Sequence, residues 1–154
     1  MVPSPVPHTS HSPLEADVCA ELTRQGVSHE HRSLHFRVHP ASGPVAEFTP
    51  DLVVRRGAIL FLVEPLAGGA ADRSRLEFLE RFLDTHSPEI VLIIVTPEAD
   101  VSRLPPASYD EAYPSKEISQ MVHRIRTQDP KGILLPFKKP DPAASGERDV
   151  RDDG

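Results

Sequence analysis

Apolar residues recur at helical spacing near the start of the chain. Four of them follow a period close to 3.6, namely Leu14, Val18, Cys19 and Leu22. Ser12 can cap a helix here, Pro13 suits the first helical position, and Glu15 lies where a capping-box carboxylate is expected. Gly26 is a suitable C-terminal cap. The pattern predicts a helix over about residues 13–25.

Strand patterns follow this helix. Apolar and polar residues alternate over 28–39, which predicts a strand, and the turn-like segment 40–44 separates it from a second strand at 46–55. A third run, 58–64, is apolar on both faces, as expected of a central strand. Because the connection between the last two runs is short, we expect 51–55 and 58–64 to form an antiparallel hairpin.

The second half of the chain reads as helix, strand and helix. Residues 71–84 carry one apolar stripe, and 90–95 are apolar on both faces. A right-handed crossover would place 90–95 parallel to 58–64. Ser115 is the expected cap of a last helix over 116–127. The order is α-β-β-β-α-β-α, which predicts an α/β fold with a mixed central β-sheet flanked by helices.

Composition fits one domain with one core. The 154 residues include 38% hydrophobic residues, 26% charged residues and 17 prolines. We expect the folded domain at 13–139, between a disordered proline-rich leader, 1–12, and a disordered acidic tail, 140–154. No apolar run reaches the roughly 18–20 residues that span a membrane, and no secretory signal is visible. We therefore expect a cytoplasmic protein with no membrane partner.

The formal net charge of −6 is shared between the tail and the body of the chain. Residues 141–154 hold five acidic and two basic side chains, and residues 1–12 hold none of either kind, so −3 remains for 13–140. An acidic body argues against strong non-specific binding of DNA, although it leaves room for a local basic patch.

Two acidic residues stand at the ends of neighbouring predicted strands. Asp51 follows Pro50 at the start of one strand, and Glu64 ends the next, so the hairpin would bring both carboxylates to the same end. Two carboxylates repel each other unless a cation lies between them, and Mg²⁺ takes oxygen ligands. The alternative is a structural Glu64 whose carboxylate reaches solvent or an arginine such as Arg55 or Arg56.

These residues and the element order resemble the PD-(D/E)XK nuclease superfamily, which has the restriction-endonuclease-like fold, and its small archaeal Holliday junction resolvases in particular. The likeness covers about residues 13–126. It implies that Asp51 and Glu64 bind Mg²⁺ or Mn²⁺ and that Glu15, from the first helix, is a third catalytic acid. It also implies DNA as the partner, and we further expect a homodimer. Helix capping alone would account equally well for Glu15.

The chain departs from this family at one position. The family's lysine, two residues after the second acid, lends a positive charge beside the scissile phosphate, and here that position is Leu66. The first lysine is Lys116, and the nearer arginines carry a fixed charge and cannot accept a proton; they are Arg55, Arg56, Arg73 and Arg75. We therefore predict a degenerate site with weak or absent phosphodiester hydrolysis. Alternatives are a non-catalytic binding or scaffolding protein that keeps only the fold, and a chance match.

The remaining candidate groups are assigned structural roles. Four histidines fall on one face of the strand expected at 28–39, namely His29, His31, His35 and His39. A row of imidazoles can bind a transition metal, but because the opposite face is apolar we expect the histidine face to be solvated. The single cysteine, Cys19, excludes a disulfide scaffold and a cysteine-based zinc site, and we expect it to be a buried structural thiol. The segment 109–111 is expected to be a solvated loop.

Overall fold

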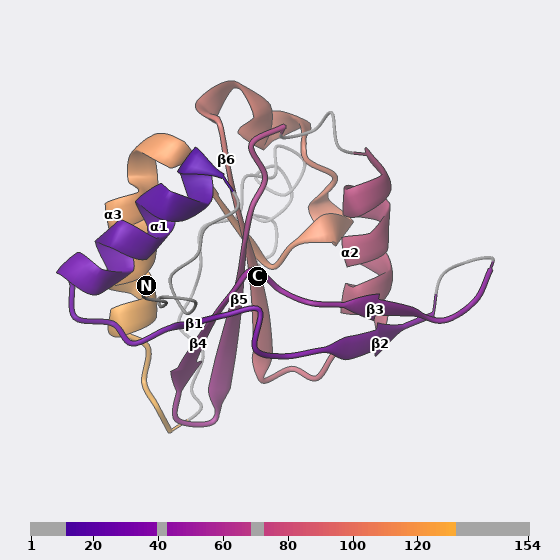
Figure 1. The fold of residues 1–154 in the computed structure, drawn as a ribbon, viewed down its shortest axis with the longest axis horizontal. Coiled ribbons are helices and arrows are strands. Elements are labelled where there is room, and N and C mark those ends of the chain that lie inside the picture. The colour runs from indigo at the N-terminus through magenta and orange to yellow at the C-terminus, as the bar shows by residue number, and fades with distance from the viewer. Residues whose placement is uncertain (1–11, 40–42, 69–72, 132–154) are drawn as a thin grey trace, which may run out of the picture.

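The computed structural model describes residues 12–39, 43–68 and 73–131, which form an α/β fold with a mixed five-stranded sheet flanked by helices (Figure 1). The strands, in spatial order, are β1 (Glu30–His31), β4 (Leu52–Arg56), β5 (Ile59–Pro65), β6 (Ile90–Thr96) and β7 (Glu111–Pro114). Strand β4 pairs antiparallel with β1 and β5, and β6 pairs parallel with β5 and β7.

Helices cover both faces of this sheet. Helices α1 (Pro13–Arg24) and α3 (Ile118–Arg126) lie on one face, and α2 (Arg73–Thr85) lies on the other (Figure 1). A separate two-stranded sheet of β2 (Phe36–Val38) and β3 (Ala46–Phe48) packs on the α2 side. Alternate residues of β5 therefore enter different apolar clusters: Phe61 and Val63 pack with α1 and α3, and Leu62 packs with α2.

The predicted central hairpin is confirmed. Leu52 lies opposite Val63 and Arg56 opposite Ile59, and β6 runs parallel to β5 on the other side, as the helical crossover requires. The hairpin turns at Gly57, whose φ of +59° is a left-handed conformation that favours glycine. The first helix also begins as predicted, because the Ser12 side chain accepts a hydrogen bond from the Glu15 amide at 3.1 Å.

The predicted strand at 28–39 is wrong as a single element. It divides into β1 and β2, which belong to different sheets, because Arg32 adopts a left-handed φ of +51° and turns the chain between them. The strand predicted at 46–55 likewise divides into β3 and β4, on either side of the segment 49–51.

The end of the domain also differs from the prediction. The loop predicted from 97 contains two short 3₁₀ helices, η3 (Glu98–Arg103) and η4 (Pro106–Ser108), and a third, η5 (Ser115–Glu117), replaces the first turn of the last helix. Ser115 therefore does not cap α3, which begins after Glu117 without a side-chain cap. The expected solvated loop at 109–111 runs instead into β7, where Glu111 is fully buried.

The predicted tail and the first eleven residues of the predicted leader lie outside the described residues. Among the described residues, no helix has the length and apolar character needed to cross a bilayer.

Substitution of Gly57 tests how closely the hairpin turn packs. A Cβ at this position would lie 2.0 Å from the Pro130 carbonyl oxygen, whereas a Cβ at Gly26, also left-handed at φ +73°, would meet nothing within 4 Å. We expect Gly26→Ala to cost about 1–2 kcal/mol for its backbone conformation alone. Gly57→Ala should cost more than about 3 kcal/mol, because segment 127–131 must also move. Urea unfolding of both variants measures the difference, and equal costs would contradict the packing at Pro130.

Candidate carboxylate–arginine site

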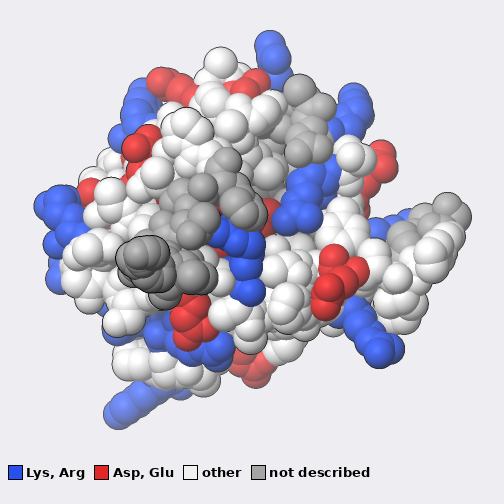
Figure 2. Space-filling view, in the orientation of Figure 1, with Lys and Arg blue, Asp and Glu red and all other residues white. Residues whose placement is uncertain are grey.

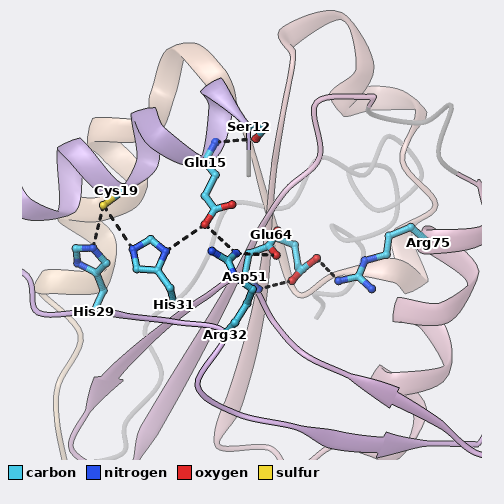
Figure 3. A network of polar contacts seen from close by, with 9 residues as sticks. All are labelled: Ser12, Glu15, Cys19, His29, His31, Arg32, Asp51, Glu64 and Arg75. Carbon is cyan, nitrogen blue, oxygen red and sulfur yellow. Dashed lines mark hydrogen bonds and ion pairs between the residues drawn. The ribbon is translucent and has the colours of Figure 1, made fainter. Parts of the chain in front are cut away.

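The hairpin brings Asp51 and Glu64 to the same end of the sheet (Figure 3). The register that places Leu52 opposite Val63, continued by one residue, places Asp51 opposite Glu64. The Asp51 amide donates a hydrogen bond to Glu64 Oε2 at 2.9 Å. The two acids therefore meet as the sequence predicts, and they are joined through a backbone hydrogen bond.

A guanidinium from α2 holds the other oxygen of Glu64. Arg75 Nη2 donates to Glu64 Oε1 at 2.7 Å, and the Arg75 side chain is 28% exposed while that of Glu64 is fully buried. Burial raises the pKa of Glu64 to about 7; Arg75 opposes this rise and the nearby Asp51 adds to it. The cation beside Glu64 is therefore Arg75, and Arg55, which sequence reasoning offered for this role, pairs with Glu30 instead.

A second guanidinium joins Asp51 to Glu15. Arg32 Nη1 lies 3.0 Å from Glu15 Oε2 and 3.5 Å from Asp51 Oδ1, and the Arg32 amide donates to the Asp51 carbonyl at 3.1 Å. The Glu15 side chain is 1% exposed and also accepts from His31 Nδ1 at 3.1 Å. The Glu15 backbone thus belongs to the helix cap, while its carboxylate points across to the sheet.

These residues form one cluster at the end of the sheet, which we call the carboxylate–arginine site. It runs from α1 to α2 through five side chains: Glu15, Arg32, Asp51, Glu64 and Arg75 (Figure 3). Three carboxylates face two guanidinium groups, which leaves one formal negative charge at neutral pH when all three acids are ionised. The arrangement neutralises most of the mutual repulsion of the acids with charges from the chain itself.

Leu66, at the position of the family's lysine, contributes no polar group to this site. It is 7% exposed and packs in the apolar cluster on the α2 side of the sheet. Its amide donates to the Val95 carbonyl at 2.8 Å, which continues the β5–β6 pairing. A lysine here would have to place its ammonium among apolar side chains or extend it toward the acids.

A second cluster lies on the other side of Glu15 and corrects the predicted histidine face. His29 Nε2 lies 3.2 Å and His31 Nε2 lies 3.6 Å from Cys19 Sγ (Figure 3). The side chain of His31 is 3% exposed, whereas His35 and His39 are exposed as predicted. Cys19 is half-buried, and burial together with Glu15 raises the pKa of its thiol, which is unfavourable for a nucleophile.

Sequence reasoning did not find Arg32 or the contact between Cys19 and the histidines. Both depend on the left-handed turn at Arg32, because that turn ends β1 immediately after His31 and points the Arg32 guanidinium back toward Glu15. An arginine directly after the H-x-H pattern gives no sign of such a turn. The sequence contains several arginines that could pair with Glu64, and only the packing of α2 against the sheet identifies Arg75 as its partner.

Comparisons with protein-family models, with curated proteins and with solved structures found no match for this chain. The described residues therefore define this protein only by its fold, which is an α/β fold with a mixed five-stranded sheet and a carboxylate–arginine site at one end of that sheet.

The raised pKa of Glu64 predicts a dependence of stability on pH. Glu64 keeps its proton up to about pH 7 in the folded protein, but an unperturbed glutamate loses it near 4.5. The raised pKa therefore stabilises the folded protein fully below pH 4.5, and this stabilisation is lost as the pH rises to 7. The loss is about 3 kcal/mol, because each unit of pKa difference corresponds to roughly 1.4 kcal/mol. Glu64→Gln removes this contribution. We expect the difference in unfolding free energy between wild type and variant to fall between pH 4.5 and 7, as measured by urea unfolding; a constant difference would contradict it.

Proposed function

We propose that this protein is a PD-(D/E)XK nuclease-like DNA-binding protein in which hydrolysis is very weak or lost. The observation that carries the proposal is the pairing of the expected metal-binding acids with arginines. Arg75 contacts Glu64 and Arg32 contacts Asp51. Arg75 and the Asp51 amide engage the two oxygens of Glu64, and Arg32 lies beside one oxygen of Asp51. This arrangement therefore does not fit a Mg²⁺ or Mn²⁺ ion at Asp51 and Glu64.

The element order supports the likeness to the nuclease fold. If the β2–β3 sheet is treated as an insertion, the described order can be aligned with the order that the resemblance implies: helix α1, antiparallel strands β1, β4 and β5, helix α2 and parallel strand β6. The acids Glu15, Asp51 and Glu64 then fall at one end of this core, as in the family's pattern.

DNA remains the proposed partner because the site presents cations as well as acids. The side chains of Arg32, Asp51 and Arg75 are 22%, 23% and 28% exposed, while those of Glu15 and Glu64 are buried. A guanidinium group suits a phosphate because two of its N–H groups can donate to one anion. The partly exposed guanidinium groups of Arg32 and Arg75 are therefore the groups of this site that would contact a DNA backbone.

A scaffolding function without DNA is the second candidate, and the charge of the surface favours it. On the face shown in Figure 2, acidic and basic side chains are interspersed, with basic groups at several separate places. The chain as a whole carries a formal charge of −6. Strong non-specific binding of DNA usually relies on a continuous basic surface.

The wild-type protein is expected to show no Mg²⁺- or Mn²⁺-dependent cleavage of duplex or four-way junction DNA.

The double variant Leu66→Lys/Arg75→Ala supplies the missing lysine and frees Glu64 from its guanidinium partner. A gain of up to about 10²–10³ in cleavage rate is expected, the usual range for one electrostatic contact to the transition state. Adding Glu64→Gln should abolish that gain, which excludes a contaminating nuclease. Strong metal-dependent cleavage by the wild type would contradict the proposal.

DNA binding is tested with two charge-balanced pairs of substitutions, each of which removes one arginine of α2 and its acidic partner. Glu64→Gln/Arg75→Gln removes the ion pair of the site, and Arg81→Gln/Asp84→Asn removes an exposed pair of α2 as the control. We expect fluorescence anisotropy to show several-fold weaker binding for the first pair only, with the salt dependence reduced by about one phosphate contact. No binding by the wild type would favour the scaffolding function.

A further inference from the structure

We propose that Cys19, His29 and His31 bind a zinc ion with Sγ and the two Nε2 atoms as ligands. The proposal concerns a different cluster from the carboxylate–arginine site and does not depend on the nuclease-like function. Its three donor atoms lie within 4.8 Å of one another; Cys19 and His29 are half-buried, and the His31 side chain is 3% exposed. Although the single cysteine excludes a zinc site built from cysteines, two histidines complete a mixed set of soft and borderline ligands.

The spacing of the donors fits tetrahedral coordination. Zn–S bonds of about 2.3 Å and Zn–N bonds of about 2.0–2.1 Å place a sulfur and a nitrogen ligand about 3.5 Å apart. The distances from Cys19 Sγ are 3.2 Å to His29 Nε2 and 3.6 Å to His31 Nε2. The ion therefore requires only small movements of side chains that already converge.

Each imidazole is oriented by an acceptor on its far side. His29 Nδ1 lies 3.1 Å from the Val27 carbonyl oxygen, and His31 Nδ1 lies 3.1 Å from Glu15 Oε2. Carbonyl and carboxylate oxygens accept hydrogen bonds, so the geometry assigns the N–H of each ring to Nδ1 and leaves each Nε2 on the side of Cys19. A carboxylate or carbonyl behind a histidine is the usual support of a zinc ligand.

A zinc ion can also engage all three donor atoms of this cluster, which a thiol proton cannot do. A thiol carries one hydrogen and can donate it to one ring nitrogen at a time, whereas Zn²⁺ accepts lone pairs from all three donors at once. The thiol releases its proton to solvent as the metal binds. Three ligands from the chain leave a fourth position, which water would fill in the half-exposed setting.

The position of the cluster indicates a structural role for the ion. Cys19 belongs to α1, while the two histidines lie at and just before β1, an edge strand of two residues. A zinc ion would tie this short strand to the helix. It would also hold His31 against Glu15, which connects the metal to the carboxylate–arginine site through one hydrogen bond.

Cobalt spectroscopy tests the ligand set directly. The full untagged chain, treated with a chelator and dialysed, is titrated with Co²⁺ and then with Zn²⁺. We expect one equivalent of Co²⁺ to give a thiolate-to-metal charge-transfer band and intense visible bands of tetrahedral cobalt, and Zn²⁺ to remove both. Absence of the charge-transfer band in the folded wild-type protein would overturn the proposal.

Variants identify the individual ligands. Cys19→Ser should abolish the charge-transfer band, and His29→Ala should weaken Zn²⁺ binding at least 100-fold. Glu15→Gln should weaken it about 10-fold while the band remains, because this residue only supports a ligand. His35→Ala, an exposed histidine outside the cluster, is the matched control and should bind as the wild type does. Equal losses for His29→Ala and His35→Ala would overturn the assignment.

Thermal unfolding of the wild-type protein and the control variant tests Zn²⁺ binding even if one ligand variant folds poorly. Zn²⁺ should raise the Tm of the wild-type protein and of His35→Ala, and the chelator should reverse the rise, because the ion binds the folded state. Mg²⁺ at the same concentration should leave the Tm unchanged, since it prefers oxygen ligands. A Zn²⁺-dependent rise that persists in both Cys19→Ser and His29→Ala would place the ion elsewhere and overturn the proposal.

Discussion

The burial of the Glu64 carboxylate is the constraint on which the end of the sheet depends. An ionised carboxylate removed from water costs several kcal/mol unless donors and a cation replace its hydration shell. The chain supplies the Asp51 amide from the neighbouring strand and the Arg75 guanidinium from α2. Helix α2 is thereby attached to the sheet by a charged contact as well as by its apolar stripe, with Leu76, Leu79 and Phe82 buried beneath it. The position of the helix and the protonation of the acid are consequently linked.

A second buried carboxylate is paired with an arginine in the same way on the edge strand β7. Glu111 of β7 is fully buried and accepts from Arg124 of α3, which also lies over the Phe61 ring. Here too a helix reaches down to a strand carboxylate with an arginine. The two helices on opposite faces of the sheet are therefore each held by an apolar stripe and by one ion pair to a buried carboxylate.

The sequence predicted those parts of the fold that follow from periodicity. The runs 58–64 and 90–95 are apolar on both faces, which identifies central strands whatever surrounds them, and α1 carries its own cap. The periodicity of the sequence did not predict the backbone conformation of individual residues. Arg32 takes a left-handed φ that an arginine rarely adopts, so the division of 28–39 and the gathering of His29 and His31 at Cys19 had no local sign. Glu111 was misplaced for a related reason, because its burial depends on an arginine thirteen residues away.

The brevity of β1 has a consequence for contacts between molecules. Its two residues cover only Leu52 and Val53 of β4, so among the described residues the remainder of that strand, Val54 to Arg56, forms an edge of the sheet without a β1 partner. Such an edge can accept a strand from another chain. Arg55 and Arg56 stand along this stretch, and Arg55 extends across to Glu30. Charged side chains along a sheet edge discourage the addition of a foreign strand, so self-association by extension of the sheet is disfavoured on this side.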